Sequence, residues 1–473
     1  MADNELYRLT AMQAVRRLRD KQLTPLDLVE AAAARIEAVD GNLNAMPTHC
    51  FERAREHAKS LMKASAESRP AGWLGGLPIA VKDLVDVAGV RTTYGSPIYA
   101  NHVPQRSDLL VERLEANGAI VIGKSNTPEF GAGASTFNEV FGKTRNPWNG
   151  AKSVSGSSGG SAAALASGQV WLATGSDLGG SLRLPASFNA VLGLRPSPGC
   201  VARGPELLPF ATLSVEGPMA RSAEDLALML DAMSGTHPLD PLAVAAPARS
   251  YLQQVGEMPP PRRIGFSADL GFGVLNPEVG NICERAAATL AGACNAELVG
   301  DAPDLDGAQD CFQTLRAAQY AANHREKLAE HRELLKPEVI WNIEKGLALT
   351  AAEIGAAEHR RARLVQATGE FFQRCDLLVC PVAIVPPFDV DVRYVEQVGK
   401  HRFDNYIDWM TVTYVISLLG CPALSAPGGF TTDGLPVGLQ IVAPPRHEAR
   451  AIAAAQILET ATGIAQQLPI DPR

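Results

Sequence analysis

The turn that ends at Ser181 has the residue types that acyl transfer requires. It lies in VWLATGSDLGGSLRLPAS, residues 170–187, where an apolar, strand-like run leads into a glycine-rich segment. The two glycines carry no Cβ that would block the approach of a carbonyl group. Four successive N–H groups could converge there as an oxyanion hole, those of Leu178, Gly179, Gly180 and Ser181. Taken alone, the sequence is equally compatible with a tight strand-to-helix turn that binds nothing.

A nucleophilic serine needs a base, and the sequence near this turn offers a lysine. Between residues 75 and 199 the single histidine is His102, in the loop-like sequence YANHVPQRSD, so a Ser-His-Asp triad is poorly supported. Lys82 lies at the centre of GGLPIAVKDLVDV, where apolar neighbours on an expected buried strand would lower the pKa of its ammonium group. A neutral lysine can accept a proton. A lone lysine is more commonly a surface or ion-paired residue, so this interpretation depends on the surrounding motifs.

Two other segments match the sequence patterns of known catalytic or nucleotide-binding motifs. SVSGSSGGS, residues 153–161, contains GxSxG, which would make Ser158 the nucleophile of an α/β-hydrolase, but AKSVS is a weak strand and no local signal marks a partner histidine. GAIVIGKS, residues 118–125, matches a phosphate-binding loop with Lys124 as its lysine. The residues between its two glycines are strand formers that we expect to be buried, whereas the loop must point its N–H groups inward. This context argues against an ATPase.

The motifs around these residues resemble those of the amidase signature family. The serine-glycine motif is SGSSGGSAAALASG, the nucleophile motif is GSDLGGSLRLPAS and the lysine motif is GGLPIAVKDLVDVAG. Further segments are similar to family segments in the family's order: IGKSNTPEFG, TRNPWN, GLRPSPG, GPMARSAEDLALMLDAMSG and DGLPVGLQIV. The resemblance covers about residues 20–235 and 375–455 and is highly specific, whereas residues 240–370 are only generically similar.

The resemblance implies a catalytic triad of two serines and one lysine. Ser181 would be the nucleophile, Lys82 the general base, and Ser157 the serine that relays a proton between them. Ser157 lies 75 positions after Lys82, and Ser181 lies 24 positions after Ser157, as the family pattern expects. The family also implies a cis peptide bond between Gly156 and Ser157. The N–H groups of residues 178–181 would form the oxyanion hole, and this chemistry needs neither a metal nor a cofactor.

The same resemblance implies supporting and substrate-binding residues. Asp177 and Arg183 match common family positions and are expected to hold the turn through hydrogen bonds. Residues 129–133 should line the acyl side of the site. The expected substrate contacts are therefore Gly131, Ala132, Gly133 and Ser157. Ser155 replaces a usual glycine and Ser176 a usual threonine, and neither change removes a catalytic group.

The implied activity is hydrolysis of the C–N bond of a small or aryl carboxamide, with esters and carbamates as related substrates because they share the tetrahedral chemistry. The alternative is the amidase subunit of a tRNA-dependent amidotransferase, which passes ammonia to a partner. That branch typically has a Met-Asp-Glu-Phe-Ala type of segment where this chain has NTPEFGAGASTFNEVFG, which favours the free-standing hydrolase. The sequence does not name the substrate. Four aromatic residues are candidates for the pocket, although the core is their commoner place: Tyr320, Trp341, Trp409 and Tyr414.

The elements that would position this site are short buried strands joined by tight loops. Within residues 75–199 the apolar runs LPIAV, AIVIG, VWLAT and AVLGL alternate with Gly, Ser and Asn, and DLLVCPV and LPVGLQIV later restore strand character. We therefore expect an α/β fold with a single mixed, twisted β-sheet flanked by helices on both faces, as in the amidase signature fold. Near the N-terminus, a helix should open with Thr24 as its N-cap and Pro25 in its first turn.

We expect a single amidase domain over residues 1–473. Its expected parts are a helical flank at 1–70, the signature core at 75–235, a variable, mostly helical substrate-pocket region at 240–370, and a return to the core sheet at 375–455.

The composition argues against several other classes of protein. The net charge is −8 and there is no run of Lys and Arg, so nucleic acid is not an expected partner. The N-terminus lacks the apolar segment of a signal peptide, and the most apolar run, LLVCPVAIVPPF, is short and broken by prolines, so we expect a cytoplasmic protein without membrane association. The eight cysteines form no CxxC pair, and His324 and His331 lack an acidic residue at ligand spacing, so no metal site is expected. The oligomeric state stays open, and a homodimer is compatible with the sequence.

Overall fold

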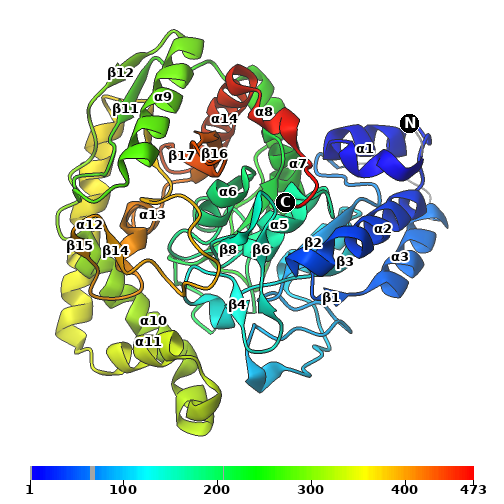
Figure 1. Cartoon of the computed structure of the whole chain (residues 1–473), viewed down its shortest axis with the longest axis horizontal. Coiled ribbons are helices and arrows are strands. Elements are labelled where there is room, and N and C mark those ends of the chain that lie inside the picture. Colours follow the sequence, from blue (N-terminus) through cyan, green and yellow to red (C-terminus); the bar gives the residue numbers. More distant parts are fainter. Residues whose placement is uncertain (1–2, 64–69, 206) are drawn as a thin grey trace.

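The centre of the molecule is one large mixed β-sheet flanked by helices (Figure 1). The computed structural model describes residues 3–63, 70–205 and 207–473, and within these residues the sheet has eleven strands. In spatial order they are β1 (Thr48–His49), β3 (Ile120–Ser125), β2 (Pro78–Lys82), β8 (Leu172–Asp177), β10 (Val215–Ala220), β9 (Leu192–Arg195), β16 (Ala423–Phe430), β17 (Pro436–Val442), β13 (Leu377–Pro381), β11 (Arg263–Phe266) and β12 (Glu297–Val299). The expected α/β fold with a mixed sheet is confirmed.

The direction of the strands places two predicted site residues at one edge of the sheet. β3, β2 and β8 run parallel to one another, as do β13, β11 and β12, and the other neighbours are antiparallel. Lys82 is the last residue of β2 and Asp177 is the last residue of β8. Since ligands of such sheets commonly bind beyond the carboxyl ends of parallel strands, this edge is where a site is expected.

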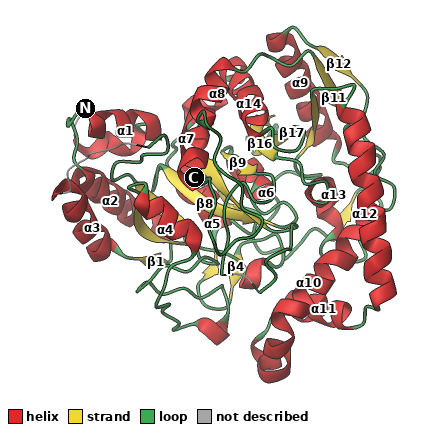
Figure 2. Ribbon diagram, turned by 180° about the vertical axis from the view of Figure 1, so that it is seen from behind, coloured by secondary structure: helices red, strands yellow, loops and turns green. Residues whose placement is uncertain are grey.

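Helices surround the sheet along its whole length (Figure 2). In the described part of the chain they are α1 (Ala11–Arg19), α2 (Pro25–Leu43), α3 (Phe51–Lys63), α4 (Leu109–Ala116), α5 (Gly159–Ala166), α6 (Arg183–Asn189), α7 (Ala223–Met233), α8 (Tyr251–Glu257), α9 (Pro277–Cys294), α10 (Ala308–His331), α11 (Pro337–Leu347), α12 (Ala351–Phe372), α13 (Thr411–Ser417) and α14 (Glu448–Thr462). Both views place α10, α11 and α12 on the side of the molecule opposite to α1, α2 and α3. None of these helices combines the length and the apolar character that crossing a membrane would require.

Small strand pairs lie outside the main sheet. They are β4 (Phe137–Asn138) with β5 (Gly142–Lys143), β6 (Arg145–Asn146) with β7 (Asn149–Ser153), and β14 (Gln397–Val398) with β15 (His401–Arg402). The first three residues of the weak strand AKSVS thus belong to β7, outside the central sheet.

The start of α2 agrees with its sequence signals. Thr24 Oγ1 accepts a hydrogen bond from the backbone N–H of Asp27, and Asp27 Oδ2 accepts one from the N–H of Thr24. Pro25 occupies the first helical position, where its missing N–H costs no helical hydrogen bond. The predicted N-cap at Thr24 is confirmed.

The segment GAIVIGKS is a turn followed by a buried strand. Every residue of β3 (Ile120–Ser125) is buried. Lys124 Nζ forms an ion pair with Asp83 Oδ1 at 3.1 Å and also donates to Val85 O and Thr92 Oγ1. A lysine held by these partners inside the protein does not reach a nucleotide phosphate, which agrees with the sequence argument against an ATPase.

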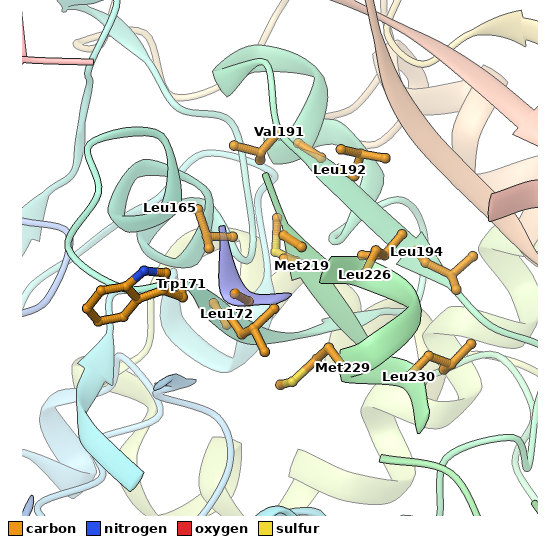
Figure 3. Packing of buried hydrophobic residues seen from close by; sticks show 14 of the residues in the cluster. Leu165, Trp171, Leu172, Val191, Leu192, Leu194, Met219, Leu226, Met229 and Leu230 are labelled. Atoms are coloured by element: carbon orange, nitrogen blue, oxygen red, sulfur yellow. The ribbon is translucent and has the colours of Figure 1, made fainter. Parts of the chain in front are cut away.

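The strand that leads into the turn at residues 178–181 is anchored in the main core. Figure 3 shows side chains from α5, α7, β8, β9, β10 and the residues beside them gathered into one apolar cluster. Its labelled members are Leu165, Trp171, Leu172, Val191, Leu192, Leu194, Met219, Leu226, Met229 and Leu230. Because close-packed interiors have little freedom to shift, this cluster fixes β8 and thereby the turn that follows it.

Leu172→Ala in β8 is expected to lower the free energy of unfolding by about 2–5 kcal/mol, because the side chain is fully buried and its loss leaves a cavity. Urea unfolding followed by circular dichroism measures this change. The matched control is Leu347→Ala at the end of α11, where the side chain is 55% exposed and the change should stay within about 0.5 kcal/mol. Equal effects of the two substitutions would contradict the role of Leu172 in the core.

Candidate active site

A cavity of about 170 Å³ brings together most of the residues expected from the sequence. Those that line it are Gly131, Gly133, Ser157, Leu178, Gly179 and Ser181. The other expected residues lie behind its wall: Lys82, Ala132, Asp177, Gly180 and Arg183. The candidate nucleophile and the candidate relay serine therefore face the same space.

Lys82 contacts three serine hydroxyls. Its side chain is fully buried, and Nζ lies 2.6 Å from Ser157 Oγ and 2.9 Å from both Ser158 Oγ and Ser176 Oγ. An ammonium group can donate to all three oxygens, whereas a neutral amine can donate to two and accept the proton of the third. The geometry is thus compatible with both protonation states of the lysine.

Burial and nearby charges act in opposite directions on the pKa of Lys82. Burial lowers the pKa of its ammonium group to about 7, although the negative charges of Glu216 and Asp177 favour the charged form. At neutral pH a large fraction of Lys82 is therefore uncharged. The sequence-based expectation that burial would lower this pKa agrees with the structure.

Ser157 follows a cis peptide bond with Gly156, as the family resemblance implied. The next residue, Ser158, is fully buried, and its backbone N–H donates to Ser181 O at 3.2 Å, which ties the two serine segments together. Within the described residues no hydrogen bond joins Ser157 Oγ to Ser181 Oγ. Catalytic hydrogen bonds are often long in the absence of substrate. Because Ser158 does not reach the cavity, the GxSxG interpretation loses its nucleophile.

The carboxylate of Asp177 organises the turn that carries Ser181. Its oxygens accept hydrogen bonds from the N–H groups of Gly180 and Leu182 and from the guanidinium group of Arg183. Although burial disfavours its charged form, Arg183 and Arg195 hold the pKa of Asp177 well below its usual range. The expected hydrogen bonds of Asp177 and Arg183 are therefore present, and the carboxylate is charged throughout the physiological pH range.

One expected oxyanion donor is already occupied. Gly180 N–H donates to Asp177 Oδ1 at 2.8 Å, and Gly180 does not line the cavity. Leu178, Gly179 and Ser181 do line it, so their N–H groups stay the candidate oxyanion donors. Gly180 instead has a backbone role: its φ of 122° is unfavourable for other residues, and a Cβ there would lie 2.7 Å from Thr413 Oγ1.

The segment 129–133 lines the cavity only in part. Gly131 and Gly133 do so, together with Phe130, which sequence reasoning did not single out. Ala132 is fully buried in a small apolar cluster behind the wall, and its carbonyl accepts a hydrogen bond from Lys336 Nζ at 2.5 Å. Glu129 is also turned inward, where it accepts hydrogen bonds from Ser96 Oγ and the N–H of Lys336. Within the expected range 129–133, Phe130 thus lines the cavity and Ala132 does not.

Helix α10, which lies within the expected substrate-pocket region 240–370, forms a wall of the cavity. The lining residues recur at helical spacing along one face: Phe312, Arg316, Gln319, Tyr320, Asn323 and His324. The helix contacts segment 129–133 directly, since Tyr320 Oη donates to Phe130 O at 3.0 Å and the rings of His324 and Phe130 lie 4.7 Å apart. The period of α10 was readable in the sequence, but nothing there showed which element its polar face would meet.

The four candidate aromatic residues separate into different environments. Tyr320 lines the cavity, whereas Trp409 and Tyr414 are fully buried in the core. Trp341 lies in a different, open groove beside Tyr394 and Tyr406. Trp409 and Tyr414 thus lie in the core, and Tyr320 is both buried in a small apolar cluster and part of the cavity wall.

His324 is a wall residue of the cavity. Burial, together with the nearby charge of Lys327, lowers the pKa of its imidazole to about 3, so His324 is neutral at physiological pH. Within the described residues no cluster of three or more His, Cys, Asp or Glu side chains has an arrangement suited to a metal ion.

Comparison with known proteins identifies the fold and the chemistry together. A family model described as Amidase matches residues 27–452. The chain belongs to the amidase signature family. A solved structure of a bacterial aryl acylamidase belonging to the amidase signature enzymes superimposes with a TM-score of 0.88 at 26% identity, covering 98% of this chain and 99% of that one.

Two curated relatives of this amidase have different functions. An acylamidase from Rhodococcus erythropolis is 31% identical, with 100% of this chain and 99% of the relative covered. A glutamyl-tRNA(Gln) amidotransferase subunit from Anaeromyxobacter dehalogenans is 34% identical, with 99% of this chain and 98% of the relative covered. Family membership and these relatives make the chain an amide-hydrolysing enzyme, while the nearly equal similarities leave its substrate open.

Proposed function

We propose that this chain is a free-standing amide hydrolase that cleaves the C–N bond of a small or aryl carboxamide through an acyl-enzyme on Ser181. The observation that carries the proposal is the 2.6 Å hydrogen bond between Lys82 Nζ and Ser157 Oγ, next to a cavity that Ser157 shares with Ser181. A buried lysine with a pKa of about 7 is suited to act as the base of this pair.

The reaction begins with a proton relay. Neutral Lys82 takes the proton of Ser157 Oγ, and Ser157 takes the proton of Ser181 Oγ as that oxygen attacks the amide carbonyl. The carbonyl oxygen becomes an oxyanion that accepts hydrogen bonds from the N–H groups of Leu178, Gly179 and Ser181. Each such donor is commonly worth about 10²- to 10³-fold in rate.

The intermediate then collapses. The C–N bond breaks, the leaving nitrogen takes the proton that the relay holds, and an ester between the acyl group and Ser181 Oγ remains. A water molecule attacks this ester by the same relay, which releases the carboxylic acid and restores the serine. Esters and carbamates would follow the same sequence because they form the same kind of tetrahedral intermediate.

The size of the cavity supports a small or aryl acyl group. A protein cavity of about 150 Å³ can hold benzene, so a cavity of about 170 Å³ has room for one aromatic ring or a short chain. A panel of primary amides, anilides, carbamates and esters, scored for the ammonia, amine and acid released, tests the proposal. If every member of the panel were left intact, a free-standing hydrolase of small amides would be excluded.

The second candidate is the amidase component of a tRNA-dependent amidotransferase, and the relative at 34% identity supports it. The two candidates differ in what they require. An amidotransferase component would release ammonia from glutamine and would copurify with a second protein. Hydrolysis of anilides by the isolated chain, without a partner and without activity on glutamine, would favour the free-standing hydrolase.

The activity is expected to rise with pH around the pKa of Lys82. Only the neutral amine can take a proton, so with a pKa of about 7 the active fraction is about one tenth at pH 6, one half at pH 7 and nearly complete at pH 9. Initial rates at saturating and at low amide concentration between pH 5.5 and 9.5 measure this profile. A profile that stayed flat across this range would argue against a lysine base.

A further inference from the structure

The α10 wall of the cavity carries a buried positive charge. Arg316 lines the cavity, and only 6% of its surface is exposed. It lies one helical turn before Gln319 and Tyr320, which line the same wall. Arg316 therefore borders the space in which the substrate of the proposed reaction would lie.

The protein surrounds this charge with neutral groups. Arg316 Nη1 donates to Asn342 Oδ1, Nη2 donates to Tyr406 Oη at 2.8 Å, and the guanidinium carbon lies 4.5 Å from the centre of the Tyr320 ring. No carboxylate in the described part of the chain forms an ion pair with Arg316. A buried charge without a counter-charge is costly, and a guanidinium group has five N–H donors, of which these two contacts use only part.

Two carboxylates on neighbouring segments have other partners. Glu338 forms two hydrogen bonds with Arg393, at 2.7 and 3.0 Å. Glu129 accepts hydrogen bonds from Ser96 Oγ and from the N–H of Lys336. Neither carboxylate forms an ion pair with Arg316 in the described part of the chain.

The charged side chains among the described lining residues are both positive. Among the cavity's described residues the charged side chains are two arginines, Arg203 and Arg316, and none is an aspartate or a glutamate. His324 is neutral at physiological pH and adds no charge of either sign. None of the described residues that line the cavity carries a negative charge.

We propose that Arg316 binds a carboxylate of the substrate, so that the preferred substrates are amides that carry a carboxylate group. The proposal rests on the amide hydrolysis proposed above. The planar fork of N–H donors on a guanidinium group matches the two oxygens of a carboxylate, and such charge-assisted pairs are stronger than neutral hydrogen bonds. The substrate would thereby supply the counter-charge that the protein does not.

Two matched series of substrates test the preference. The first compares the monoamides succinamate, glutaramate and adipamate with butyramide, pentanamide and hexanamide, which places the carboxylate on the acyl side. The second compares N-acetyl-β-alanine and N-acetyl-γ-aminobutyrate with N-acetylpropylamine and N-acetylbutylamine, which places it on the amine side. The measured quantity is the ratio of kcat/KM between charged and uncharged members, and the wild-type ratio is expected to exceed ten in one series.

The variant Arg316→Gln should reduce this ratio about tenfold to a hundredfold, as expected for losing hydrogen bonds to a charged group. Arg316→Lys keeps the charge without the fork and should retain part of the ratio. Arg325→Gln, the same substitution at an exposed position of α10, is the matched control and should leave the ratio unchanged. Equal losses on charged and uncharged amides in Arg316→Gln, or no preference of the wild type in either series, would overturn the proposal.

A binding measurement separates this proposal from the proposed function. Calorimetric titration of glutaramate and N-acetyl-β-alanine into Ser181→Ala requires no turnover, and adding Arg316→Gln should weaken the binding of one of them by at least tenfold. Unchanged affinity for both would refute carboxylate binding even if amides are hydrolysed. Arg316-dependent binding in a protein that hydrolyses no amide would instead refute only the proposed reaction.

Discussion

Ser181→Ala is expected to reduce amide hydrolysis by about 10⁴- to 10⁶-fold while the protein stays folded. Ser181 Oγ is the atom that forms the proposed ester, and among the described lining residues Ser181 is the serine that belongs to the turn 178–181. The substitution removes one oxygen from a residue that lines the cavity, so the packing of β8 and α6 is retained. Ammonia release from a reactive amide, together with a thermal unfolding curve, measures both effects.

Ser214→Ala is the control for this substitution. Ser214 also lines the cavity, but its position is outside the proposed relay, and its replacement should cost less than about tenfold. Intact-protein mass spectrometry during turnover of an ester should show an acyl adduct in the wild type and in Ser214→Ala, and none in Ser181→Ala. Retention of full activity or of the adduct in Ser181→Ala would show that another residue is the nucleophile.

The central strands could be predicted because their sequences are compatible only with short buried strands. LPIAV, AIVIG and VWLAT are short, apolar and bounded by turn residues, and they became β2, β3 and β8. β16 escaped prediction because its sequence, ALSAPGGF, contains a proline and two glycines that normally mark loops. Here the strand tolerates them with a register irregularity between Pro427 and Gly429. Tertiary pairing with β9 and β17 overrides the local signal.

The parts of the candidate site that lie in sequence motifs could be predicted. The parts that depend only on how distant segments pack together could not. Lys82 and Ser157 are 75 positions apart, and their contact followed from family resemblance rather than from any local pattern. By contrast, Gly180 N–H is taken by Asp177, and Arg316 faces the cavity, because of how the chain folds back on itself. A helix pattern such as that of α10 predicts which residues share a face, but not what that face meets.

Lys82→Met is expected to lower kcat by about 10³-fold or more, since it removes the proposed base while keeping the length and volume of the side chain. Stability should change little or increase, because the buried ammonium group is itself costly and an apolar chain of similar shape avoids that cost. A midpoint of unfolding close to that of the wild type, combined with the loss of kcat, would separate chemistry from folding. Residual activity should no longer rise through pH 7, because the group that titrates there is gone.

The combination with Ser157→Ala distinguishes a relay from two independent contributions. Because Lys82 reaches Ser181 only through Ser157 in the proposed mechanism, removing either residue interrupts the same proton path. The double variant Lys82→Met, Ser157→Ala should therefore be about as slow as the slower single variant, as for groups that act as one unit. If the two losses multiplied, Lys82 and Ser157 would have to stabilise the transition state separately. The three hydroxyl contacts of Lys82 would then serve mainly to hold the serines in place.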